Sequence, residues 1–148
     1  MLELNGLAAG AATIGCCAQM IGFATISFKD NGLKGVLAQG LGTSMLQVPN
    51  IYKNWKIWIP PTLASAIIGP IAIIYFNMEN TALESGMGSC GLVGQIGTFN
   101  AMKSKYETSY ILISILILQI IAPAIISYLI YIFMKKKNWI KDGDMKLG

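Results

Sequence analysis

The sequence contains no histidine and no arginine, and all 11 of its basic residues are lysines. Without histidine, the chain lacks the side chain most often used as a general acid or base near neutral pH, which is also the commonest metal ligand. Without arginine, it lacks the planar fork that binds phosphate through two parallel hydrogen bonds. These absences exclude a Ser–His or Cys–His nucleophile and a phosphohistidine relay within the chain, and we expect it to hold no catalytic residue.

Charged residues are also scarce. Only 12% of the 148 residues are charged, 54% are hydrophobic, and the mean hydropathy is +0.57. An ordinary soluble domain carries about twice that share of charge, so the composition excludes a soluble enzyme and indicates a membrane protein. The net charge of +4 arises from lysines that flank apolar runs. That pattern is typical of the positive-inside rule rather than of a nucleic-acid-binding patch, so we expect lipid and no nucleic acid as a partner.

The three cysteines, Cys16, Cys17 and Cys90, include an adjacent pair and no Cys-x-x-Cys. Such spacing is typical of neither a disulfide framework nor a zinc site. The spacing Gly86-x-Gly88-x-x-Gly91 matches a dinucleotide-binding fingerprint but lacks the strand–turn–helix context that the fingerprint requires. We therefore expect no metal and no cofactor.

Three uncharged stretches are long enough to cross a bilayer, at residues 6–28, 57–78 and 108–134. The first is rich in alanine and glycine, which favours close helix packing inside a bundle over contact with lipid. Proline at positions 60 and 61 suits the first turn of the second span, and Pro123 predicts a kink in the third.

Two further apolar stretches, residues 33–48 and 85–102, are short and rich in glycine. Irregular backbone at membrane depth must be buried in protein or line a cavity, so we interpret both as re-entrant segments. Charge placement favours the same topology, because only then do Lys53, Lys56 and Lys135–Lys137 all lie in the cytoplasm with the N-terminus outside. A weak echo between QGLGT at 39–43 and QIGT at 95–98 is compatible with an internal repeat.

The sequence thus predicts an all-α integral membrane fold of about three transmembrane helices plus two glycine-rich re-entrant segments. Residues 1–137 form the membrane domain in this interpretation. Residues 138–148 are a short, polar cytoplasmic tail with no separate fold.

Candidate binding residues are the polar side chains near membrane depth. Glu79 and Asn80 follow the second span and precede a glycine-rich loop, where they supply the acceptors and donors that bind sugar hydroxyls. A solvated Glu79 at the outer interface is the alternative. Gln39 and Gln95 either line a pathway or hydrogen-bond between helices, and Gln19 suits the latter role. Weaker candidates of the same kind are Thr43 and Thr98.

Four strings of the sequence closely resemble the C-terminal part of bacterial phosphotransferase-system (PTS) EIIC-type membrane proteins. They are AAGAATIGCCAQMIGF (8–23), QGLGTSMLQVPN (39–50), WIPPTLASAIIGP (58–70) and MENTALESGMGSCGLVGQIGT (78–98). The subgroup that they resemble includes the perfringolysin regulator. The specific resemblance runs from about residue 6 to residue 102, and beyond that it is generic hydrophobicity.

The resemblance implies an EIIC-like permease in the bacterial inner membrane, in which re-entrant hairpins bind a sugar that a cytoplasmic IIB-type phosphocarrier then phosphorylates. Members are considerably longer, so it also implies the C-terminal half of such a fold, completed by a second copy or by an N-terminal half. In sugar-transporting members a glutamate in a Gly-Ile-Thr-Glu-Pro-like motif contacts the sugar. Glu79 occupies a comparable place without that glycine and proline. The alternatives are a membrane sensor that does not transport and a truncated fragment that binds nothing.

Overall fold

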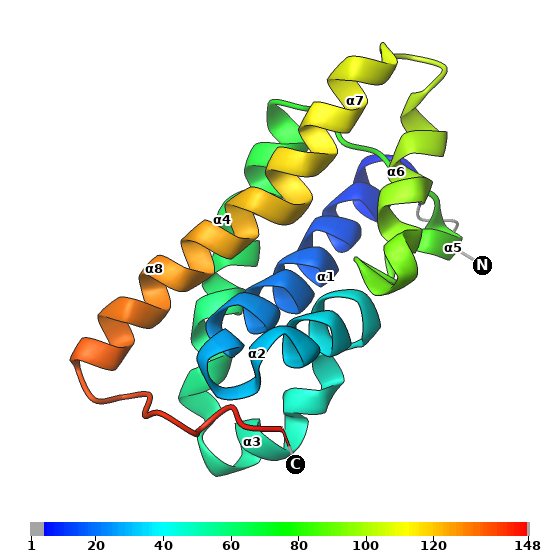
Figure 1. Cartoon of the computed structure of the whole chain (residues 1–148). Coiled ribbons are helices and arrows are strands. Elements are labelled where there is room, and N and C mark those ends of the chain that lie inside the picture. Colours follow the sequence, from blue (N-terminus) through cyan, green and yellow to red (C-terminus); the bar gives the residue numbers. More distant parts are fainter. Residues whose placement is uncertain (1–4, 148) are drawn as a thin grey trace.

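A computed structural model describes residues 5–147, and helices joined by turns and loops make up that range apart from one isolated antiparallel bridge between Gly6 and Asn80 (Figure 1). Its longer helices are α1 (Leu7–Ile26), α2 (Phe28–Leu37), α4 (Ile59–Ile74), α6 (Val93–Met102), α7 (Thr108–Ile115) and α8 (Ala122–Lys136). The short helices are α3 (Val48–Lys53) and α5 (Ala82–Ser85), with 3-10 turns at Ser44–Gln47, Trp55–Trp58 and Cys90–Leu92 and π turns at Ala38–Gly42 and Leu116–Ile121.

Three helical stretches are long and apolar enough to cross a bilayer: Leu7–Ile26, Trp55–Ile74 and Thr108–Lys136. They confirm the three predicted spans, although the second ends at Ile74 instead of continuing to residue 78. Its apolar sequence continues, but the helix stops because Asn77 adopts a positive φ of 47° and the chain turns there. The predicted fold class, an all-α membrane protein, is therefore confirmed for the described residues.

Helix α1 occupies the centre of the molecule, with α4 and α8 on one side and α2, α5 and α6 on the other (Figure 1). It is the most buried of the three spans, as its small residues predicted. At Gly22, an added Cβ would lie 2.7 Å from both Pro61 Cβ and Ser127 Oγ, so the three spans cross where α1 has no side chain. The backbone of α1 is thereby held against both of the other spans.

The third span contains a π turn, Leu116–Ile121, immediately before Pro123 at the start of α8. Proline cannot donate to the preceding turn and its ring crowds it, so a wider turn relieves the crowding. The irregularity expected at Pro123 thus takes the form of a π turn. It directs Gln119 into the protein, where the side chain is fully buried.

Residues 28–53, named hairpin 1, enter the protein and return to the end from which they started. Asp30, at the start of the hairpin, bonds to the main chain of Gly143, and Asn54, just beyond its end, bonds to Asp144. Both contacts are with the C-terminal tail, which crosses the end of the molecule beside α2 and α3 (Figure 1). The predicted re-entrant path of residues 33–48 follows from these contacts.

Residues 82–102, named hairpin 2, enter from the opposite end. Glu79, just before the hairpin, forms an ion pair with Lys105, just after it, at 2.6 Å. The hairpin turns at Gly88, whose φ of +56° suits glycine, and a Cβ there would lie 2.8 Å from Cys16 Cβ of α1. Its two ends lie together, as a re-entrant segment requires.

The tips of the two hairpins meet beside the middle of α1. The hydroxyl of Ser89 in hairpin 2 donates to the main-chain carbonyl of Gly40 in hairpin 1. A Cβ at Gly40 would be in van der Waals contact with Ala24 and Ile21. Two opposed re-entrant segments therefore meet at membrane depth, with α1 behind them.

Lysines gather at the end where hairpin 1 starts and finishes. Nine of the 11 lie in the segments that form this end: Lys29, Lys34, Lys53, Lys56, Lys135, Lys136, Lys137, Lys141 and Lys146. The remaining two, Lys103 and Lys105, follow hairpin 2 at the other end. This clustering is the one on which the positive-inside prediction of a cytoplasmic end rests, and the side of the membrane on which this end lies stays a prediction.

Candidate functional site

A cavity of about 420 Å³ opens where the two hairpin tips meet α1. Cavities that bind small ligands have volumes of about 300–1,000 Å³ and mostly apolar walls with a few polar groups. The walls come from three segments of the chain. Helix α1 contributes Gly15, Cys16, Gln19 and Met20; hairpin 1 contributes Gly42, Thr43, Ser44 and Met45; hairpin 2 contributes Gly86, Met87 and Cys90.

Glycines create the space in this tip cavity. A Cβ added at Gly15 or at Gly86 would meet no atom within 4 Å, so both positions open onto free volume. Thr43 begins the 3-10 turn of hairpin 1, and its hydroxyl accepts the main-chain N–H of Met45 at 3.2 Å. The same hydroxyl keeps its own proton, which is free to donate to a ligand.

Gln19 places an amide in the wall of the cavity. Its nitrogen donates to Thr62 at 3.0 Å and its oxygen accepts from the indole of Trp58 at 3.2 Å. These bonds join α1 to the start of α4 and agree with the expected role of Gln19 between helices. The lining also shows that Gln19 faces the tip cavity, where Gln19 and Cys16 share one face of α1 at i, i+3 spacing.

A chain of buried polar groups lies behind the cavity. Asn80, 1% exposed, donates to Thr13 at 2.7 Å and to the carbonyl of Gly94 at 3.1 Å, and its side-chain oxygen accepts the N–H of Thr81 at 2.7 Å. Thr98 donates to the same Gly94 carbonyl at 2.9 Å. These bonds join α1, the chain after α4, and hairpin 2.

Gln119 and Gln95 continue this network. Gln119, from the π turn of the third span, donates to Thr98 at 2.9 Å, and its side-chain oxygen faces the thiol of Cys17 at 3.8 Å. Gln95 donates to the sulfur of Cys17 at 3.5 Å. Its carbonyl oxygen is buried and has no hydrogen-bond partner among the described residues. Among the six predicted binding residues, Gln95 therefore has an acceptor that the fold leaves unused.

Glu79 lies away from the tip cavity, at the end of the molecule opposite the lysine-rich end. Both of its carboxylate oxygens accept from Lys105, at 2.8 and 2.6 Å, and its side chain is 21% exposed. Tyr110, where the chain enters the third span, stacks on both Phe76 and Tyr106. The ion pair closes the two ends of hairpin 2.

Gln39 belongs to a different polar cluster, at the lysine-rich end. Its amide nitrogen donates to Ser27 at 2.7 Å and to the carbonyl of Gly35 at 3.2 Å, and its oxygen accepts from Gln47 at 2.9 Å. The six predicted residues thus divide among four places. Thr43 lines the tip cavity, Asn80, Thr98 and Gln95 lie in the buried network, and Glu79 and Gln39 lie toward opposite ends.

Sequence reasoning did not single out the cysteines and methionines of the cavity, because sulfur side chains in an apolar helix are usually packing residues. The i, i+3 and i, i+4 spacing of Cys16, Gln19 and Met20 is the signal that could have identified this face of α1. In residues 5–147 no three cysteine, aspartate or glutamate side chains come together as a set of metal ligands.

Comparison with known protein families agrees with this architecture. The family described as "Phosphotransferase system, EIIC" matches residues 1–147. The chain belongs to the EIIC family. The match extends through the third span and the tail, further than the strings that first suggested it. No curated protein and no solved structure matches the chain. This EIIC protein is accordingly a membrane permease module of the phosphotransferase system.

Proposed function

We propose that this EIIC module binds a sugar in the tip cavity and carries it across the bacterial inner membrane. The observation that carries the proposal is the cavity itself, formed where two opposed re-entrant hairpins meet the central helix. Paired, glycine-interrupted segments that meet at the midplane are typical of transporter binding sites. Displacement of either tip would open the cavity toward one side of the membrane.

The polar residues have distinct roles in this proposal. Thr43 and Gln19 contact the sugar directly, because both line the cavity. Gln95 lies behind the cavity beside the buried Cys17, so its unpartnered carbonyl reaches a sugar hydroxyl only in a state that opens the buried network. Asn80 and Thr98 hold hairpin 2 in place. Glu79 acts on the sugar only in a state that frees it from Lys105. Gln39 does so only in a state that frees it from Ser27 and Gln47.

Phosphorylation needs a second protein, because the chain has no histidine and its cysteines lie within the membrane domain. We propose a cytoplasmic IIB-type phosphocarrier that meets the lysine-rich end. A second copy of the chain, or an N-terminal half, completes the bundle. This is consistent with the many apolar side chains that α4, α7 and α8 leave exposed.

The chain's own cysteines test the sugar site. Cys16 and Cys90 line the cavity and are partly exposed, whereas Cys17 is fully buried and serves as an internal control. We expect N-ethylmaleimide to modify Cys16 and Cys90 in membrane vesicles, and a bound sugar to slow both reactions without affecting Cys17. Mass spectrometry of each cysteine over a panel of hexoses and polyols measures the protection.

A cavity-filling pair supplies the second arm. Gly15→Leu inserts a side chain into the cavity, whereas Gly69→Leu places the same side chain into open space on α4, away from it. We expect Gly15→Leu to abolish sugar protection and uptake, and Gly69→Leu to retain both. If Gly15→Leu retains both sugar protection and sugar uptake, or if a sugar protects Cys17 as much as Cys16, the assignment of the sugar site is refuted.

A membrane sensor of the toxin-regulator type, which binds the same sugar without moving it, is the second candidate. The tail that ties down both ends of hairpin 1 favours it, because a fixed hairpin cannot exchange sides. Sugar protection of Cys16 without sugar counterflow in vesicles that contain the IIB partner would support the sensor. Counterflow would support the permease.

A further inference from the structure

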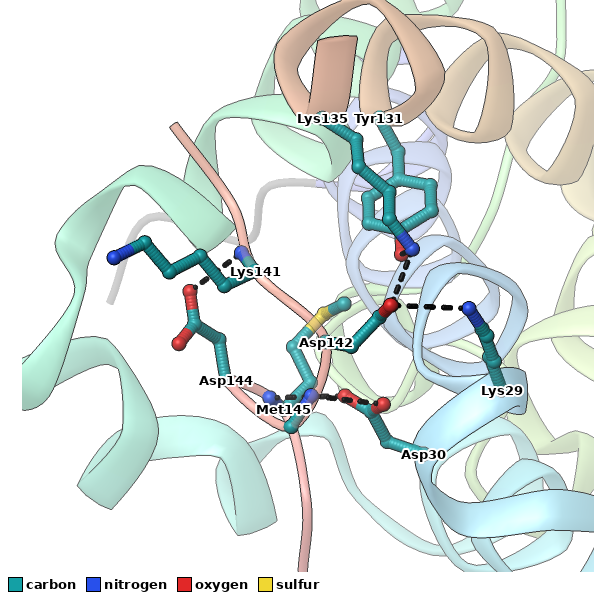
Figure 2. Close-up of polar contacts among 9 residues, drawn as sticks. Lys29, Asp30, Tyr131, Lys135, Lys141, Asp142, Asp144 and Met145 are labelled. Carbon is teal, nitrogen blue, oxygen red and sulfur yellow. Dashed lines mark hydrogen bonds and ion pairs between the residues drawn. The ribbon is translucent and has the colours of Figure 1, made fainter. Parts of the chain in front are cut away.

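The C-terminal strap, residues 139–147, lies in an open groove across the lysine-rich end. Its first set of contacts is with the start of hairpin 1. The carboxylate of Asp30 accepts the main-chain N–H groups of Gly143 at 3.1 Å and Met145 at 3.2 Å (Figure 2). Asn31 donates to the Met145 carbonyl at 2.7 Å and accepts the Leu147 N–H at 2.7 Å, which is the two-point pairing of a neighbouring strand.

The second set of contacts is with the end of hairpin 1. Gln47 donates to the carbonyl of Met145 at 3.0 Å, and Asn50 donates to the carbonyl of Lys146 at 3.0 Å. Asn54 donates to the carbonyl of Trp139 at 3.1 Å. These three contacts are made to the main chain of the strap, although Asn54 also donates to the side chain of Asp144 at 2.7 Å. The strap turns at residues 142–145, where the main-chain N–H of Asp144 donates to the Lys141 carbonyl and that of Lys146 to the Gly143 carbonyl. Amide and carboxylate side chains therefore hold mainly the backbone of this turned segment.

Two apolar side chains of the strap supply selectivity. Ile140 and Met145 are each 1% exposed and pack in one cluster with Phe23, Ile57 and Met134. Between them, Gly143 adopts a φ of +91°, and this conformation favours glycine. The strap thus has the properties of a bound peptide, with apolar anchors five residues apart and a glycine turn between them.

Asp142 links the strap to two helices. Its carboxylate accepts from Lys135 at the end of α8 and from Lys29 of hairpin 1, the latter at 3.1 Å (Figure 2). The hydrogen bond from Lys135, followed by that from Lys29, holds the pKa of Asp142 below its usual value. Hollows of about 450 and 320 Å³ remain on either side of Lys146 and Leu147, so the groove is wider than the segment within it.

We propose that the lysine-rich end of hairpin 1 is a recognition site for a short peptide segment that turns at a glycine, and that the strap is its ligand within the chain. While the strap is bound, it joins the start of hairpin 1 to its end and joins both to α8. Release of the strap frees hairpin 1 to move relative to the three spans. The site itself is defined by the strap contacts and does not depend on the sugar cavity.

Hydrogen–deuterium exchange on the full chain tests the contact. We expect slow exchange at residues 143–147 in the wild type. Asp30→Ala with Asn31→Ala should speed that exchange by at least about tenfold, since it removes four main-chain contacts, two of them to a carboxylate. The control is Glu107→Ala, an exposed carboxylate at the other end of the molecule. Equal exchange in the wild type and the double variant overturns the contact.

A peptide in trans tests recognition. Met145→Glu in the full chain places a charge in the apolar cluster, so it should empty the groove. A fluorescein-labelled peptide of residues 138–147 should then bind to Met145→Glu at a concentration at which it does not bind the wild type. It should not bind the triple variant that adds Asp30→Ala and Asn31→Ala. Absence of binding to Met145→Glu, or equal binding to all three proteins, overturns the recognition site.

Discussion

Replacing Asn80 with alanine should destabilise the membrane domain by about 3 kcal/mol, because this buried side chain loses three hydrogen bonds and each contributes about 1 kcal/mol. The bonds run to Thr13, to the carbonyl of Gly94 and from the N–H of Thr81, at 2.7–3.1 Å. The alanine also removes the acceptor of the Thr81 N–H, whereas Thr13 keeps its bond to the Ala9 carbonyl and the Gly94 carbonyl keeps its bond from Thr98. For a chain of this size, that loss lowers the melting temperature by about 6–12 °C.

Circular dichroism during heating in detergent measures the change. Asn100→Ala is the matched control, since Asn100 lies in hairpin 2, which Asn80 contacts through Gly94, but is exposed and bonds only to the exposed Lys103 among the described residues. Asn80→Asp keeps the shape but replaces the donor with an acceptor that faces the Gly94 carbonyl, so it should be at least as destabilising. A loss below about 1 kcal/mol in Asn80→Ala, no greater than the scatter expected for surface substitutions, would refute the reasoning.

Three further predictions follow from other parts of the fold. Gly10→Ala should lower the melting temperature by several degrees, because its Cβ would clash with the carbonyl oxygen of Met78. The control is Gly69→Ala, whose Cβ would meet no atom within 4 Å, so it should leave the melting temperature unchanged or raise it. Gly143→Val should speed trypsin cleavage within the strap, because valine disfavours a φ of +91°, and cleavage at the wild-type rate would count against the strap geometry. Because the pKa of Asp142 is lowered, its carboxylate stabilises the bound strap fully above pH about 4 and loses that effect as the pH falls through the lowered pKa. Hydrogen–deuterium exchange in the strap should therefore quicken only in strongly acidic buffer. Faster exchange near neutral pH would contradict this.

The spans and the re-entrant path were predictable because each rests on a property of a whole segment. Twenty apolar residues in succession predict a membrane helix wherever they occur, and the lysines at the ends of the segments limit how often the chain can cross. The end of the second span was misjudged for the same reason. Tyr75 and Phe76 continue the apolar run, but a single positive φ at Asn77 turns the chain, and hydropathy does not detect it.

The arrangement of polar side chains was less predictable, because each depends on one partner far away in sequence. Glu79 pairs with Lys105, 26 positions later, and Gln47 meets the carbonyl of Met145, 98 positions later. No local pattern marks either pair. The tail, predicted as a short polar end, contributes Ile140 and Met145 to the core, because isolated apolar residues among lysines and aspartates have no periodicity that would indicate burial.

The contact between Ser89 and Gly40 has a consequence for permeability. Hairpin 1 and hairpin 2 reach it from opposite ends of the molecule. In the proposed permease, the barrier beside α1 is then formed by two apposed glycine-rich turns, whereas a lipid bilayer needs about 30 Å of hydrocarbon for the same task. The bond between Ser89 and Gly40 is part of that barrier, so in the proposed permease a displacement of one turn would be enough to open it.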